Sequence, residues 1–103
     1  MIDESGRICV PSACCLELAT LERRGRVAFD RGASAWIRAA LADDRVEELP
    51  LTAEIAIEAG RLPETFPGDL IDRVVYATAA VVGSRLVTGD RRITSYDPER
   101  VVW

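Results

Sequence analysis

The sequence contains no histidine, lysine, asparagine or glutamine, so all 13 of its basic residues are arginines. Without histidine there is no Ser–His or Cys–His nucleophile pair and no histidine-bound zinc. Without lysine there is no lysine general base and no Schiff-base chemistry. Carboxylates, cysteine thiols and tyrosine hydroxyls are the titratable groups left for chemistry. An enzyme of this composition therefore works with carboxylates and a hard cation, or with a thiol.

Cysteine is scarce, and its three residues crowd one end of the chain, at Cys9, Cys14 and Cys15. Their number is odd and no CxxC spacing occurs, which argues against a disulfide framework or a zinc site. We expect reduced cysteines that pack as small hydrophobic residues. The alternative, a reactive thiol, requires a nearby cation that lowers the thiol pKa.

Long apolar segments are also missing. The longest uncharged run, Val74–Ser84, is much shorter than the roughly 20 apolar residues of a membrane-spanning helix. The opening MIDESGR carries acidic residues where a signal peptide carries basic ones. These features predict a cytoplasmic protein with no membrane partner.

The length of 103 residues and the 49% hydrophobic content predict one small folded domain over residues 1–103. The net charge of −4 argues against a protein that coats nucleic acid through bulk electrostatics. It leaves room for local basic patches, at Arg23, Arg24 and Arg26 and at Arg91 and Arg92.

Apolar periodicity and capping signals predict alternating strands and helices, and hence an α/β fold with a parallel sheet covered on both faces. The expected strands are 8–10, 46–49, 85–88 and 101–103. The expected helices are 12–24, 30–42, 53–60, 69–82 and a short turn at 90–96. Ser12, Asp30 and Thr52 are the expected N-caps. The stripe that carries Trp36 belongs either to the core or to a partner surface.

The first residues, MIDESG, are typical of the end of a helix that stops at Gly6. A doubly wound sheet normally opens with its central strand, yet no strand is expected before Ile8. Either the sheet is built differently, or the chain begins downstream of a fuller protein.

Acidic residues fall at places where ligands bind in parallel α/β sheets, beyond the carboxyl ends of strands. Glu17 lies in the helix after strand 8–10, Asp72 in the first turn of helix 69–82, and Asp90 just after strand 85–88. Each acid also has a structural interpretation, because carboxylates stabilise helix N-termini and serve as N-caps. The apolar neighbours of Asp72 favour a carboxylate that is paired or metal-bound.

Several segments resemble the PIN-domain family. DLIDRVVYATA is similar to the family's D-x-x-D-R-x-x-x-A-x-A stretch, and LVTGDRRI resembles its strand followed by T-x-D. VPSACCLELATL resembles the strand-to-helix segment with the second acid, and VVW the final strand. The order of the segments is most similar to that of VapC-type toxins of toxin–antitoxin pairs.

The resemblance implies a three-layer PIN-like fold and a metal-dependent endoribonuclease that uses Mg²⁺ or Mn²⁺. It implies catalytic roles for Glu17, Asp72 and Asp90, with Asp69 as a further metal ligand. It implies RNA as substrate, an antitoxin protein as partner and a homodimer. The residues expected to contact substrate are Thr88, Arg73, Arg91 and Arg92.

The family's opening strand, with its first aspartate, has no counterpart before Ile8. By resemblance the domain is N-terminally incomplete, and its sheet lacks the central strand between 8–10 and 85–88. Three arrangements stay open: the flanking strands close on each other, a partner supplies the strand, or the domain is loose. The function likewise has an alternative, an inactive PIN domain that acts by binding an antitoxin.

Overall fold

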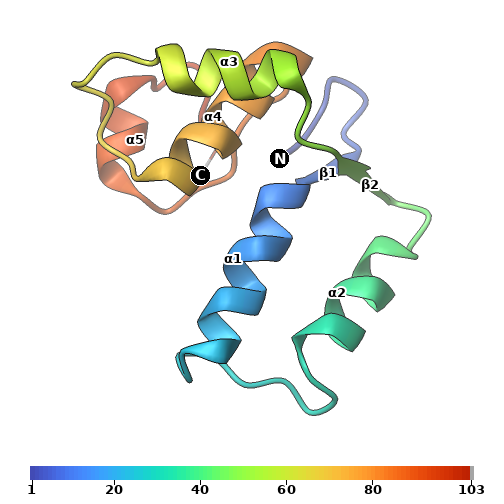
Figure 1. Cartoon of the computed structure of the whole chain (residues 1–103). Coiled ribbons are helices and arrows are strands. Elements are labelled where there is room, and N and C mark those ends of the chain that lie inside the picture. The colour runs from blue at the N-terminus through green and yellow to red at the C-terminus, as the bar shows by residue number, and fades with distance from the viewer. Residues whose placement is uncertain (103) are drawn as a thin grey trace.

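Helices alternate with short strands along residues 1–102, the part of the chain that the structure, a computed structural model, describes (Figure 1). The elements in chain order are β1 (Ile8–Pro11), α1 (Ser12–Arg23), α2 (Ala33–Leu41), β2 (Val46–Leu49), α3 (Ala53–Arg61), α4 (Leu70–Val82) and α5 (Arg91–Tyr96). Within residues 1–102, no helix is long and apolar enough to cross a membrane.

The regular sheet consists of β1 and β2, which pair in parallel with Ile8 opposite Val46 and Pro11 opposite Leu49. Because α1 and α2 lie between the two strands in the chain, this is a parallel crossover of the kind that α/β folds use. The predicted α/β class is therefore confirmed.

The prediction that MIDESG ends a helix is wrong. Ile2 forms antiparallel bridges to both Ile8 and Arg85, and a turn at Asp3–Gly6 leads into β1. Gly6 has a φ of 82°, the left-handed value expected at a helix stop, but here it serves a hairpin-like turn. Residues 1–3 thus occupy the sheet position between β1 and residue 85, so those flanking segments neither pair with each other nor face an empty gap there.

Two predicted strands are reduced to isolated bridges. Arg85 forms an antiparallel bridge with Ile2, and Leu86 forms a parallel bridge with Val101. The 85–88 segment is therefore not a regular strand in the structure. Of the predicted strand 101–103, Val101 forms a bridge, and Trp103 lies outside the described residues.

Two predicted N-caps are wrong. Pro11 stands at the N-cap of α1, and the Ser12 hydroxyl instead accepts from the Leu51 N–H at 3.2 Å. Gly32 precedes α2 in place of Asp30, and the carboxylate of Glu22 accepts from Ala33 N–H at 2.7 Å. The carboxylate of a residue eleven positions earlier thus accepts from a backbone N–H at the start of α2 that has no acceptor within the helix. Thr52 caps α3 as predicted, through the Ile55 N–H.

The core lies among α3, α4 and α5, which cluster at the top of Figure 1. Phe66, Tyr76 and Tyr96 form an aromatic group with ring centroids 5.2–5.8 Å apart. The Tyr76 hydroxyl donates to Asp97 at 2.6 Å, which fixes α5 against α4. The buried face of α4 also explains its nearly uninterrupted apolar sequence.

The opposite part of the molecule, where α1 and α2 extend away from the sheet, is less closed (Figure 1). Cys14, Cys15 and Trp36 line an apolar cavity of about 250 Å³ between these helices. Trp36 is 53% exposed, so its stripe is not fully core. All three cysteines are free, and desolvation raises the pKa of Cys9 and of Cys14, as expected for packing cysteines rather than reactive thiols.

Candidate functional site

The first turn of α4 holds two acidic residues in a reciprocal cap. The Asp69 carboxylate accepts from the Asp72 N–H at 2.9 Å, and the Asp72 carboxylate accepts from the Asp69 N–H at 3.0 Å. This capping box fixes both side chains at the positive end of the helix dipole. The prediction that Asp69 begins this helix is confirmed, and Asp72 is held in a defined orientation.

Glu17 approaches this pair from α1. Desolvation raises the pKa of Glu17, and the negative charges of Asp72 and Asp69 raise it further. Desolvation also raises the pKa of Asp72, with additional contributions from Asp69 and Asp90. The structure therefore brings Glu17 and Asp72, from two different helices, into one field of like charge.

Asp90 stands in a different environment, at the N-cap of α5. Its carboxylate accepts from the Arg92 N–H at 2.9 Å and forms a forked pair with the Arg92 guanidinium, at 3.2 Å to Nε and 2.8 Å to Nη2. These hydrogen bonds lower the pKa of Asp90 to about 2. Thr88 supports the same loop, because its hydroxyl accepts from the Asp90 N–H at 3.1 Å.

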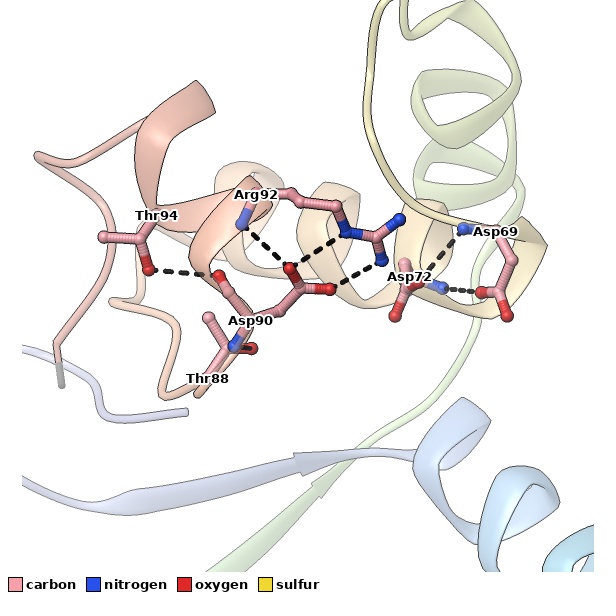
Figure 2. A network of polar contacts seen from close by, with 6 residues as sticks. All are labelled: Asp69, Asp72, Thr88, Asp90, Arg92 and Thr94. Atoms are coloured by element: carbon pink, nitrogen blue, oxygen red, sulfur yellow. Dashed lines mark hydrogen bonds and ion pairs between the residues drawn. The ribbon is translucent and has the colours of Figure 1, made fainter.

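Arg92 lies between Asp90 and the Asp69–Asp72 pair. Figure 2 shows its side chain extending past Asp90 toward Asp72. The pair with Asp90 raises the pKa of Arg92, and the charges of Asp72 and Asp69 raise it further. A cation therefore already stands where the three aspartates converge, and it belongs to the protein itself. Arg91, its neighbour, is exposed.

Arg73, the fourth predicted substrate contact, has other partners. Its guanidinium donates to the carbonyls of Leu62 at 2.9 Å and Pro63 at 3.1 Å and lies 5.7 Å from the centre of the Phe66 ring. These contacts hold the end of α3 and the following loop beside α4. Arg73 thus has a structural role that the sequence did not indicate, and its contact with substrate stays a prediction.

The four predicted metal ligands are near one another without forming a closed cage. Within residues 1–102, only Asp3, Cys9 and Glu47 form a group whose potential ligand atoms all lie within 4.8 Å of one another. Asp3 there already accepts from Ser5 and Arg7, which lowers its pKa. The predicted acids fit a hard divalent cation better than the Asp3, Cys9 and Glu47 group does, because all their ligand atoms are carboxylate oxygens that repel one another without a cation. They need not form a complete coordination shell, since Mg²⁺ keeps several of its waters when it binds to protein.

Gly68 is a residue of this site that the sequence did not single out. A Cβ atom on Gly68 would collide with the Cβ of Asp72 and lie 2.8 Å from the Phe66 ring. Only glycine therefore allows the loop to pass this close to Asp72. The signal was visible as Gly-Asp at the start of a helix, but the close approach depends on three-dimensional packing.

Comparison with known proteins identifies the family of this chain. The family model of the PIN domain matches residues 1–98. The chain is 35% identical over 101 residues to Ribonuclease VapC22 of Mycobacterium tuberculosis (strain ATCC 25618 / H37Rv), covering 98% of this chain and 76% of that relative. No solved structure matches significantly. Because the family model covers residues 1–98 and the relative is aligned over 98% of the chain, the chain belongs to the PIN-domain family, as a VapC-type member.

Proposed function

We propose that this protein is a divalent-metal-dependent endoribonuclease, the toxin of a VapC-type toxin–antitoxin pair. The observation that carries the proposal is the approach of Glu17 to Asp72: desolvation raises the pKa of both carboxyl groups, and the charge of Asp72 raises the pKa of Glu17 further, so that ionisation of these acids is costly unless a cation is bound. The similarity to a protein named as a ribonuclease supports the choice of substrate.

The acids would hold Mg²⁺ or Mn²⁺ through Glu17, Asp69, Asp72 and Asp90. A divalent ion bound there supplies a water of lowered pKa and stabilises the leaving oxygen. The capping box keeps Asp72 oriented toward the site, and Thr88 fixes the loop that presents Asp90. Arg91, which is exposed, and Arg92, once released from Asp90, would orient the phosphate with their forked donors.

The partners follow from the same proposal. RNA is the substrate, and an antitoxin protein would cover the acidic site until it is released. The toxin would act in the cytoplasm, as a homodimer of this chain.

The test is cleavage of single-stranded RNA with Mn²⁺ or Mg²⁺, compared with EDTA. Asp72→Asn should lower the rate by at least about 100-fold, because it removes one carboxylate ligand while the Asn oxygen can still accept from the Asp69 N–H. Asp44→Asn, an exposed acid in the loop before β2, is the matched control and should cleave like wild type.

Two results would contradict the proposal. Cleavage that persists in EDTA, or that is equal in Asp72→Asn and wild type, would mean a contaminating or metal-independent nuclease. Absence of metal-dependent cleavage together with tight binding of an antitoxin peptide would favour the alternative, an inactive PIN domain that acts by protein binding.

A further inference from the structure

Three arginines stand together at the end of α1 and in the turn after it. Arg23, Arg24 and Arg26 are all exposed. Among residues 1–102, no carboxylate lies within ion-pair distance of any of these three guanidinium groups. In a chain of net charge −4, this is a concentration of unneutralised positive charge.

The backbone fixes where this charge lies. Gly25 has a φ of 71°, its N–H donates to the Glu22 carbonyl, and the Arg26 N–H donates to the Leu21 carbonyl. This is a Schellman motif, which ends the helix and folds the next residue back against its last turn. Arg26 is thereby held beside Arg23 and Arg24 rather than on a free loop.

The nearest acid on the same helix is engaged elsewhere. Glu22 accepts from the Ala33 N–H at 2.7 Å and so serves as the cap of α2. It points its charge toward the second helix, and the arginines stay available to an outside anion.

A cavity connects these arginines to the candidate site. It has a volume of about 500 Å³ and is lined by residues of α1, of the turn after α1 and of the start of α4, among them Glu17, Thr20, Arg23, Arg24, Arg26 and Asp69. Glu17, Thr20 and Arg24 follow the i, i+3, i+7 spacing of one helix face. At 1.5 Å per residue, Glu17 and Arg24 are separated by about 10 Å along the helix axis.

We propose that this groove, from Glu17 to Arg26, binds the phosphodiester backbone of single-stranded RNA next to the phosphate at the acidic site. The assignment rests on the proposed nuclease function for the identity of the substrate. Arginine forks suit phosphate oxygens, and contacts of this kind position a strand without reading its sequence. The groove thus gives the acidic site a defined direction in which the strand leaves.

Helix-dipole stabilisation alone does not account for the cluster. Cations near a helix C-terminus are favourable within the last turn. That explains Arg23, which lies in the last turn of α1, but not why Arg26, beyond the helix, also lines the cavity with the acids.

The test measures RNA binding separately from cleavage. The protein carries Asp72→Asn, the buffer contains EDTA, and the probe is a fluorescein-labelled oligouridylate followed by fluorescence anisotropy at several KCl concentrations. The triple variant Arg23→Ala, Arg24→Ala, Arg26→Ala should bind roughly 10-fold or more weakly. Its plot of log K against log salt should be shallower by about 2, since each phosphate contact on single strands contributes about 0.7.

The control is Arg31→Ala, Arg38→Ala, Arg61→Ala, three exposed arginines that do not line this cavity. It removes the same charge but outside the groove, so it should weaken binding only slightly and keep the salt dependence of the Asp72→Asn parent. An unchanged slope in the groove variant, or an equal change in both triple variants, would overturn the proposal. No cleavage is measured in this test. RNA binding in the groove could therefore be confirmed for a protein without nuclease activity, and it could be refuted for a protein that is an active nuclease. Circular dichroism checks that each variant is folded.

Discussion

Two Gly-Asp pairs begin helices at the candidate site, one before α4 and one before α5, and their surroundings are opposite. Gly68-Asp69 is closed in by Asp72, whose carboxylate is partly desolvated and faces other acids. Gly89-Asp90 is open, with nothing within 4 Å of a Cβ placed on the glycine, and its acid is held by Arg92. The same dipeptide thus begins one helix whose acids face other acids and another whose acid is paired with an arginine.

The difference shows how charge is distributed over the candidate site. At the α4 end, desolvation and the charges of neighbouring carboxylates raise the pKa of Glu17 and of Asp72, so a cation is favoured there. At the α5 end, an arginine already supplies the positive charge and lowers the pKa of Asp90 to about 2. An incoming divalent ion would therefore meet its first open ligands at α4 and compete with Arg92 for Asp90.

The largest expected effect distinguishes the two glycines. Gly68→Ala should lower the free energy of unfolding by about 1–3 kcal/mol, because the new methyl group forces Asp72 or Phe66 to move. Gly89→Ala, in open space, should change it by less than about 0.5 kcal/mol. Urea unfolding of both variants measures this. Equal losses would show that the α4 loop is no more tightly packed than the α5 loop.

A smaller effect concerns competition at Asp90. Arg92→Ala should bind Mn²⁺ about twofold to fivefold more tightly than wild type, because the carboxylate is freed and a nearby positive charge is lost. Titration calorimetry measures the affinity, and Arg91→Ala, which removes a neighbouring charge, is the control. Weaker binding in Arg92→Ala would mean that the arginine supports the ion.

The smallest effect is a difference in how stability depends on pH. Asp72 has a raised pKa in the folded protein, so the native state binds more protons than the unfolded chain above pH 3.8, and stability falls as pH rises through the folded pKa. Asp90 has a folded pKa of about 2, so its stabilising contribution is complete above pH 3.8 and is lost as pH falls through about 2.

Thermal unfolding of Asp72→Asn and Asp90→Asn, measured from about pH 2 to neutral pH, separates the contributions of the two carboxyl groups to stability. Relative to wild type, Asp72→Asn should gain stability as pH rises toward neutrality. Asp90→Asn should lose stability at neutral pH and approach wild type near pH 2. If the stability of both variants depended on pH in the same way as that of wild type, the proposed difference between Asp72 and Asp90 would be wrong.

Sequence reasoning succeeded where the controlling interactions are local. The α4 helix with its start at residue 69, the Thr52 cap and the β2 strand were all predicted from neighbouring residues. It failed where a residue distant in the sequence determines how a helix begins, as with Glu22 of α1, whose carboxylate caps α2. It also failed at Gly6, because a left-handed glycine serves a helix stop and a tight turn equally well.

At the candidate site, too, some features were predicted from the sequence and others were not. Proximity of Glu17 and Asp72 followed from helices at the ends of parallel strands, and the structure brings their charges together. The forked pair of Asp90 with Arg92 was not predicted, because it depends on the rotamers of two side chains that are two residues apart. The catalytic assignment of these acids stays a prediction.

The placement of residues 1–3 has a consequence for local opening. Ile2 exchanges hydrogen bonds with Arg85, and the Met1 carbonyl accepts from the Cys9 N–H at 2.7 Å. Together with the packing of α1 on α4, this short segment joins the β1–β2 pair to the part of the chain that carries Asp90. The amide protons of Ile2, Cys9 and Arg85 should therefore exchange with solvent as one cooperative unit, and their exchange rate would report how often the two halves of the molecule separate.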